Sequence, residues 1–162
     1  DGAAAMLLAS EDWARKKNLP ILAYLTFVKV AAVNFINDEG LLMAPAYAVS
    51  DMLKQAKLRL QDFDYYEIHQ AYAAQTVATL KAWQSEKFCR DRLGRNEPMG
   101  PIDLSRLNVK GGSIAMGHPF AATGARIMGT LAKVLGEKGS GRGLISVCTA
   151  GGMGVSAIME AA

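Results

Sequence analysis

Apolar runs and apolar helical stripes alternate along this chain and predict its regular elements. The apolar run 3–9 and the run 21–33, which is rich in β-branched and aromatic residues, predict two strands. Apolar residues three and four positions apart within 49–56 predict one buried helix face. The same reasoning predicts the remaining elements: a short helix capped by Ser10 and ending at Lys17, strands over 65–69, 144–148 and 155–159, and helices over 73–83 and 123–135.

Polar and glycine-containing segments separate these elements. They cover the loop 34–45 with turn residues at 37–40, the turn 62–64, the polar stretch 86–106 and the turn 136–143. Strands and helices in this order predict an α/β layer fold. The last two strands are close enough in sequence to pair antiparallel, so we expect a mixed sheet. The helix over 73–83 is expected to turn Ala73, Val77 and Leu80 inward.

Composition narrows the class of protein. The chain has 162 residues, of which 51% are hydrophobic and 20% charged, enough for a packed core and against wholesale disorder. A net charge of +3 is too weak to indicate nucleic-acid binding. The apolar runs are too short to span a bilayer. Two cysteines make no disulfide framework and favour a reducing compartment, and with the two histidines they lack zinc-ligand spacing.

Three reactive side chains are expected at strand or helix ends. His69 ends a strand, His118 lies between Gly117 and Pro119 before a helix, and Cys148 ends a strand before a glycine cluster. Ligands of open α/β sheets collect at such strand ends, and a nearby imidazole lowers a thiol pKa. Each also has a structural alternative, as a core cysteine or a carbonyl-bonded histidine. The basic residues within 87–95 favour a solvated surface over a phosphate or partner contact.

Three segments resemble the motifs of the thiolase family, in the family's order. Residues 108–126 read N-V-K-G-G-S-I-A-M-G-H-P-F-A-A-T-G-A-R and resemble N-x-x-G-G-x-I-A-x-G-H-P-x-x-x-S/T-G-A-R. Residues 148–154 resemble C-x-x-G-G-x-G. Residues 69–75, H-Q-A-Y-A-A-Q, are similar to N-E-A-F-A in its H-E-A-F-A form, which is typical of 3-ketoacyl-CoA thiolases of fatty-acid β-oxidation complexes.

The resemblance implies a role for each candidate residue. The family cleaves 3-ketoacyl-CoA with free CoA to acetyl-CoA and a shortened acyl-CoA. Cys148 would protonate the departing acetyl-CoA enolate and then accept the proton of the incoming CoA thiol. His118 would activate a nucleophilic cysteine and donate to the enolate oxygen. His69 would hold a water that completes this oxyanion hole, and the backbone N–H of Ala150 would serve a second one.

The resemblance also implies the organisation of the chain. The fold would be thiolase-like, with a mixed sheet covered by helices on both faces. Residues 1–19, which include a segment similar to the D-G-A-A-A strand, would end the N-terminal domain, and 20–162 would form the C-terminal domain. The first residue is not Met, so we expect a piece of a longer protein. The nucleophilic cysteine belongs to the N-terminal domain, so this piece alone would be inactive, and Cys89 would not replace it.

The family further implies substrates and partners. CoA and acyl-CoA would be substrates, with no tightly bound cofactor and no metal. The whole protein would form homo-oligomers, pair with a hydratase/dehydrogenase subunit, and work in the cytoplasm of a bacterium or in a mitochondrion. Gln70 and Tyr72 replace the usual Glu and Phe, which leaves open a non-catalytic acyl-CoA-binding or assembly module. A related condensing enzyme is disfavoured by the G-H-P and C-x-x-G-G-x-G motifs.

Overall fold

A mixed β-sheet forms the centre of the computed structural model, which describes residues 1–36 and 39–162. Within these residues the sheet has four strands in the order β1-β4-β3-β2. The strands are β1 (Ala23–Ala32), β2 (Tyr65–Ile68), β3 (Arg142–Thr149) and β4 (Met153–Ala161). β2 and β3 are parallel, whereas β4 pairs antiparallel with both β3 and β1. The expected mixed sheet and the expected antiparallel pair are both confirmed.

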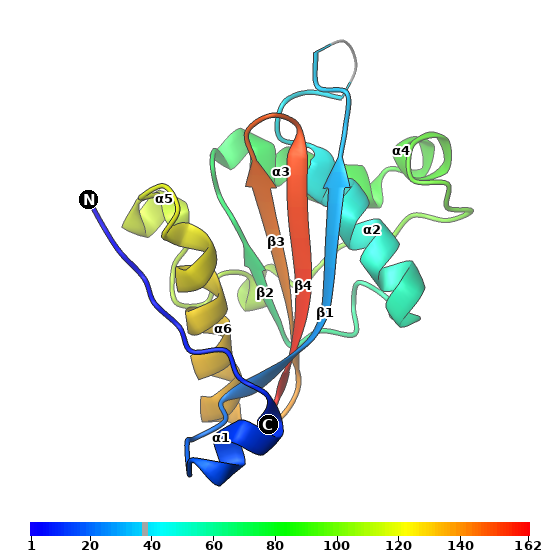
Figure 1. Ribbon diagram of the computed structural model, residues 1–162. Coiled ribbons are helices and arrows are strands. Elements are labelled where there is room, and N and C mark those ends of the chain that lie inside the picture. The colour runs from blue at the N-terminus through cyan, green and yellow to red at the C-terminus, as the bar shows by residue number, and fades with distance from the viewer. Residues whose placement is uncertain (37–38) are drawn as a thin grey trace.

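Helices cover both faces of this sheet (Figure 1). The helices are α1 (Glu11–Lys16), α2 (Ala44–Ala56), α3 (Ala73–Gln84), α4 (Glu86–Asp91), α5 (Ser113–Met116) and α6 (Thr123–Lys138), with a 3-10 turn over Leu104–Arg106. Residues of α2 pack with Leu144 of β3, and residues of α6 pack with its neighbour Ile145. Adjacent residues of a strand point to opposite faces, so α2 and α6 lie on opposite sides of the sheet.

The segment 3–9 is not a strand, contrary to the sequence prediction. It has no regular secondary structure, and apart from the half-buried Met6 its side chains are exposed. A strand depends on a neighbour that accepts and donates its backbone hydrogen bonds. This segment instead runs alongside α6 towards α1 (Figure 1) and has no strand beside it in the described part of the chain.

Helix α3 turns a different face inward from the one expected. Ala73 and Val77 are exposed and Leu80 is only half-buried. The buried face instead carries three polar residues, one alanine and one large aromatic residue, namely Gln75, Thr76, Thr79, Ala82 and Trp83. Gln75 donates to Thr79 Oγ1 at 3.0 Å, so these two polar groups satisfy each other inside the protein. An apolar stripe cannot reveal a face of this kind.

The expected polar stretch 86–106 contains a short surface helix with one buried residue, Cys89. Ser85 caps α4 by accepting from the Phe88 N–H at 3.1 Å. Cys89 is fully buried, and its thiol donates to the carbonyls of Ala82 and Trp83. The charged residues of α4 form surface ion pairs such as Lys87–Asp91, as the solvated interpretation expected.

Two predicted turns need further comment. Helix α6 continues through Lys138 and β3 begins at Arg142, so the predicted turn 136–143 shrinks to the residues between them. Asn37 and Asp38, part of the turn predicted over 37–40, lie outside the described residues. No helix in the described part of the chain is long and apolar enough to cross a membrane.

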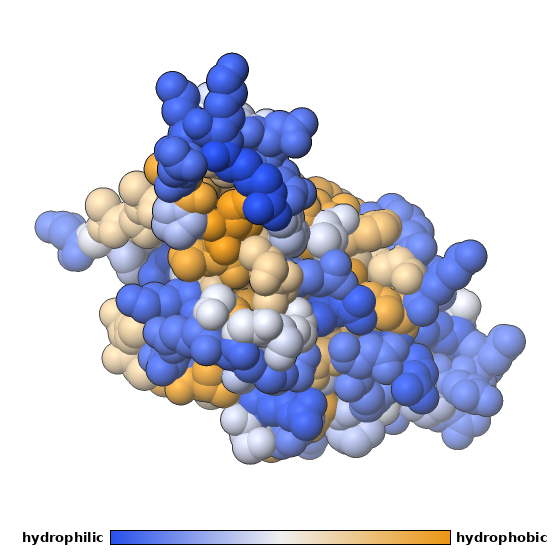
Figure 2. Space-filling view, turned by 90° about the horizontal axis from the view of Figure 1, so that it is seen from below, coloured by the Kyte–Doolittle hydropathy of each residue, from blue (hydrophilic) through white to orange (hydrophobic). Residues whose placement is uncertain are grey.

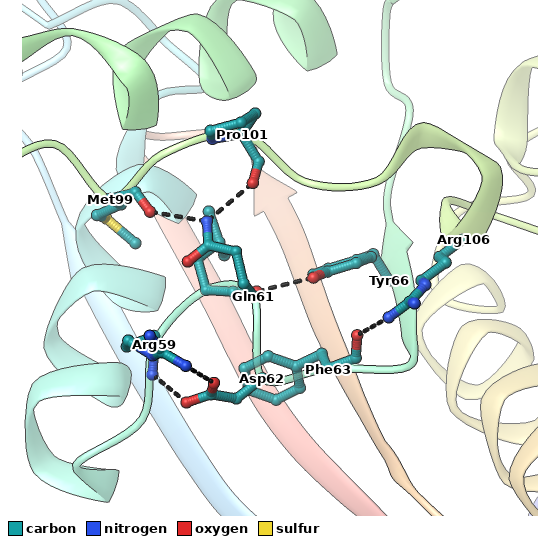
Figure 3. A network of polar contacts seen from close by, with 9 residues as sticks. Arg59, Gln61, Asp62, Phe63, Tyr66, Met99, Pro101 and Arg106 are labelled. Atoms are coloured by element: carbon teal, nitrogen blue, oxygen red, sulfur yellow. Dashed lines mark hydrogen bonds and ion pairs between the residues drawn. The ribbon is translucent and has the colours of Figure 1, made fainter.

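A network of polar contacts holds the start of β2 (Figure 3). Asp62 accepts from the Arg59 backbone N–H at 2.8 Å and closes the turn before the strand. The Gln61 carboxamide donates to the carbonyls of Met99 and Pro101 at 2.9 and 2.8 Å. Tyr66 of β2 donates to the Leu60 carbonyl at 2.8 Å. These bonds tie the turn to a distant segment and fix where β2 begins.

Candidate functional site

The candidate site lies at the carboxyl ends of the parallel strands β2 and β3. The backbone N–H of His69 donates to the Ser146 carbonyl at 2.8 Å, which continues the pairing one residue past β2. Cys148 lies two residues beyond Ser146 on β3. The structure therefore brings the two strand-end candidates to one edge of the sheet, where open α/β sheets bind ligands.

Asn108 fixes the backbone immediately before His69. Its side-chain oxygen accepts from the Ile68 N–H at 2.9 Å, and its amide donates to the Ile68 carbonyl at 3.0 Å. Its own N–H donates to the Tyr66 carbonyl at 2.8 Å. Asn108 adopts φ 47°, a left-handed conformation that Asn tolerates better than most residues. Asn108 begins the 108–126 motif, and its position in that motif predicted no role for it.

His69 is buried, with 2% of its surface exposed. Its ring centroid lies 4.3 Å from that of His118, and its Nδ1 lies 2.9 Å from Ser113 Oγ. Burial first, and then the neighbouring His118 and Arg126, lower the pKa of His69 to about 4. His69 is therefore a neutral imidazole near neutral pH.

His118 is exposed and lies in the loop before α6, five residues ahead of Thr123. Its Nδ1 lies 2.6 Å from Oγ1 of the buried Thr123, in the first turn of that helix. Gly117 on one side has φ 91°, and Ala121 on the other has φ 69°, which is unusual for a residue with a side chain. The exposed Phe120 ring lies 4.8 Å from the imidazole. The imidazole is thus held at one nitrogen within a tightly turned segment.

Cys148 is buried, with 6% of its surface exposed. Its thiol donates to Oε1 of Gln75 at 3.8 Å, and the Ala71 backbone N–H also bonds the sulfur. Burial raises the pKa of the Cys148 thiol, and the two backbone hydrogen bonds only partly oppose this. The expectation of a lowered thiol pKa is therefore wrong. Desolvation dominates, and the sulfur carries its proton at neutral pH.

The segment 69–75 connects the three side chains. His118 packs on the ring of His69 at its start, and Cys148 bonds Ala71 and Gln75 further along. Ala150 is exposed in the tight turn between β3 and β4, one residue past Thr149. Gly151 and Gly152, with φ 88° and 75°, complete this turn, and such positive values favour glycine.

Two charged residues near His69 were not predicted as site residues. Arg126 of α6 donates from Nη2 to Ser113 Oγ at 3.2 Å. Glu67 of β2 is 2% exposed, and burial raises its pKa to about 7 while the charge of Arg126 opposes the rise. The sequence contains a sign of each residue: Arg126 is the last residue of the 108–126 motif, and Glu67 is a charged residue within an otherwise apolar strand.

Other features of the structure do not coincide with this site. A cavity of about 570 Å³ lies between the N-terminal segment, α1, the start of β1 and α6, and none of the candidate residues lines it. Apolar side chains gather on the face of the molecule that carries α1 (Figure 2). The described residues contain no group of three or more His, Cys, Asp or Glu side chains that could hold a metal ion.

Comparison with known proteins gives consistent matches. The family description "Thiolase, C-terminal domain" matches residues 19–161. Two curated relatives, the 3-ketoacyl-CoA thiolases of Shewanella sp. (strain W3-18-1) and Yersinia pestis (strain Pestoides F), are 43% and 44% identical over 160 residues. The alignment covers 99% of this chain and 36% of each relative, so the chain spans about a third of their length.

Solved structures agree with these matches. A thiolase from Ascaris suum in complex with coenzyme A has a TM-score of 0.72 at 28% identity, over 95% of this chain and 35% of that one. The peroxisomal 3-ketoacyl-CoA thiolase of Saccharomyces cerevisiae has a TM-score of 0.72 at 33% identity, over 93% and 37%. It is described as a five-layered structure of alternating helices and sheets, made of two core domains of identical topology.

Proposed function

The chain belongs to the thiolase family, whose C-terminal domain it matches over residues 19–161, and on that premise we propose that it carries the acid, base and oxyanion-binding groups of a two-domain 3-ketoacyl-CoA thiolase. The reaction is the thiolysis of 3-ketoacyl-CoA by CoA, in fatty-acid β-oxidation. The single observation that supports this most is the placement of His69, His118 and Cys148 around one segment at the ends of β2 and β3.

His118 is assigned the role of base towards a nucleophilic cysteine supplied by the preceding domain. Its exposure fits this role, because the group must reach an atom outside this chain. Attack of that cysteine on the 3-keto carbon and cleavage of the adjacent carbon–carbon bond leave an acyl-enzyme and the enolate of acetyl-CoA. The enolate oxygen needs donors, for which we assign His118 and a water held by His69. Loss of one such donor costs about 10²–10³ in kcat.

Cys148 is assigned the role of acid towards the enolate carbon. A thiol with a raised pKa holds its proton until the carbanion forms, which suits an acid. Its proton completes the methyl group of acetyl-CoA, and the thiolate that remains takes the proton of the incoming CoA thiol. The CoA sulfur then attacks the acyl-enzyme to release the shortened acyl-CoA. The N–H of Ala150 is assigned to the oxyanion of that tetrahedral intermediate.

CoA is proposed as a substrate rather than a resident cofactor. The Ascaris suum thiolase supports this, since it is described in complex with coenzyme A. The domain boundary is placed between 19 and 20, which the start of the family match at residue 19 supports. Homo-oligomers, a hydratase/dehydrogenase partner, and a cytoplasmic or mitochondrial location complete the proposal.

A preceding domain would pack on the α6 side of the sheet. Val28 and Val30 of β1 are 50% and 61% exposed. They pair with Ala157 and Val155 of β4, and Ala157 packs in the core formed with α6. This uncovered apolar area beside α6 supports a second domain there, in keeping with the layered description of the yeast enzyme.

The test joins this chain to the N-terminal part of the Shewanella relative and measures the thiolysis of acetoacetyl-CoA. We expect activity in the joined protein, none in the 162-residue chain, and a loss of at least about 10²-fold in Cys148→Ser. Cys89→Ser is the matched control, because Cys89 is equally buried but packs against α3. Equal thiolysis in both variants would contradict the role of Cys148, and CoA binding without thiolysis in the joined protein would favour the non-catalytic module instead.

A further inference from the structure

The two neighbouring imidazoles are held by hydroxyl groups that differ in their second partner. His69 Nδ1 meets Ser113 Oγ at 2.9 Å, and His118 Nδ1 meets Thr123 Oγ1 at 2.6 Å. A hydroxyl has one proton to donate and can accept twice. Its second partner therefore decides whether it donates to the imidazole or accepts from it, and so which ring nitrogen carries the proton.

Ser113 has a second partner that can only donate. Arg126 Nη2 donates to Ser113 Oγ at 3.2 Å, and a guanidinium has no acceptor. Ser113 is buried, so a hydroxyl proton without an acceptor would be costly. Of its two partners only His69 can accept that proton. His69 Nδ1 is then the acceptor, and the neutral ring carries its proton on Nε2.

Thr123 has a second partner that can only accept. Its hydroxyl donates to the Pro119 carbonyl at 3.4 Å, which leaves its lone pairs for His118. His118 then donates from Nδ1, and its Nε2 carries a free lone pair. The two rings, 4.3 Å apart, would present opposite tautomers, one with a donor and one with an acceptor at Nε2.

We propose that Arg126 is a positioning residue that acts through Ser113 to hold the Nε2–H tautomer of His69, opposite to the tautomer of His118. The use of this arrangement in catalysis rests on the proposed function, since a base requires a lone pair and a water-holding donor requires an N–H. The tautomers themselves do not rest on it. They follow from the hydrogen bonds alone.

The environment of Arg126 favours a functional over a stabilising role. Its Nη1 is buried without a hydrogen-bond partner within 1–36 and 39–162, which is unfavourable for a charged group. The charge of Arg126 acts on the titratable groups Glu67 and His69, and His118 in turn lies against His69. An apolar side chain of similar length would pack there without that unpaired nitrogen, so Arg126→Met is expected to fold.

The direct test is ¹⁵N NMR of the histidine rings. The sequence contains only two histidines, so only four ring nitrogens are observed. At pH 8, where a typical imidazole is neutral, we expect a pyridine-like Nδ1 in His69 and a pyridine-like Nε2 in His118. Arg126→Met should convert His69 to a mixture of tautomers and leave His118 unchanged. The same tautomer in both rings of the unmodified chain would overturn the proposal.

Arg95→Met provides a matched control. Arg95 Nε donates to Oγ of Ser50 on α2 at 2.8 Å, which is a similar arginine–serine hydrogen bond. This variant should leave the spectra of both rings unchanged, and a shift of His69 as large as in Arg126→Met would contradict the assignment.

Kinetics of the joined enzyme separate this inference from the proposed function. If both hold, Arg126→Met lowers kcat by about 10-fold or more, with KM nearly unchanged. Opposite tautomers without thiolysis in any variant would leave the inference standing and contradict the proposed function. Thiolysis with identical tautomers, or with an unaltered His69 in Arg126→Met, would do the reverse.

Discussion

Two imidazoles at the same strand ends occupy opposite environments. His69 is buried: Asn108 holds the backbone before it, and Ser113 bonds its ring. His118 instead is exposed beside Phe120. The buried ring has a pKa lowered to about 4 and is fixed in one protonation state. The exposed ring can reach groups outside the chain. The comparison teaches that burial, and not residue type, separates a fixed donor from a group able to exchange protons.

Removal of each imidazole from the joined enzyme is expected to have the largest effect and to distinguish the two rings by their losses in kcat. His118→Ala would remove both the proposed base and a proposed oxyanion donor, so we expect kcat to fall by about 10⁴-fold or more. His69→Ala would remove only the group proposed to hold a water, for which a loss of about 10²–10³-fold in kcat is expected. Steady-state thiolysis measures both, with the Cys89→Ser protein as reference. Equal losses would contradict the separate roles.

The pH dependence of unfolding should reveal the buried ring. The folded pKa of His69 is about 4, below the ordinary 6.5, so only the unfolded chain binds a proton between these values. Stability from His69 therefore falls by about 3 kcal/mol as pH drops from 7 to 4. Glu67 has the opposite sign: its folded pKa is about 7, above 4.5, so its stability contribution falls as pH rises through this range.

These two slopes oppose each other, and variants separate them. Urea unfolding of the unmodified chain should change little between pH 4.5 and 6.5. Glu67→Gln should lose stability as the pH falls, and His69→Gln should lose stability as the pH rises. A Glu67→Gln protein whose stability does not respond to pH in this window would show that His69 is not desolvated.

Asn108 should stabilise the backbone around His69 and not the backbone around His118. Asn108→Leu leaves the N–H and carbonyl of Ile68 without side-chain partners, so we expect a loss of about 2 kcal/mol in the free energy of unfolding. Hydrogen exchange should increase at residues 67–69, while 117–120 stay as they are. Faster exchange in both segments alike would show that the two rings share one scaffold.

The smallest effect is expected beside the exposed ring. Ala121 has φ 69°, a conformation that costs a residue with a Cβ about 1 kcal/mol. Ala121→Gly should raise the free energy of unfolding by about that amount in urea. Ala122→Gly is the control, since Ala122 has an ordinary φ of −86° and should lose stability with its buried methyl group. A gain in both variants would rule out strain as the cause.

The sequence predicted the elements that pack on the sheet and missed what depends on partners. β1 was predicted from its β-branched and aromatic residues and α2 and α6 from helical spacing of apolar residues, and all three are confirmed. The segment 3–9 has the apolar pattern of a strand, but within residues 1–36 and 39–162 no strand lies beside it to pair with. Apolar periodicity also failed for α3, because the Gln75–Thr79 pair satisfies its own polar groups in the interior.

The candidate site was foreseen in its residues but not in its electrostatics. Strand ends and glycine-framed positions indicated His69, His118 and Cys148, and the structure places them around one segment. The sign of the Cys148 pKa shift was missed, because desolvation depends on the packing of α3 and not on neighbours in sequence. Arg126 was missed since its contact with Ser113 joins α6 to α5.

Exchange of the acetyl-CoA methyl protons with deuterated water tests the central claim most directly. In the proposed mechanism, this half-reaction needs the Cys148 sulfur to move a proton and the two imidazoles to stabilise the enolate, and it forms no acyl-enzyme. In the joined enzyme we predict rapid exchange that is lost in Cys148→Ser and kept in Cys89→Ser. Equal exchange in the two variants would contradict the claim that these three residues form one proton-transfer site.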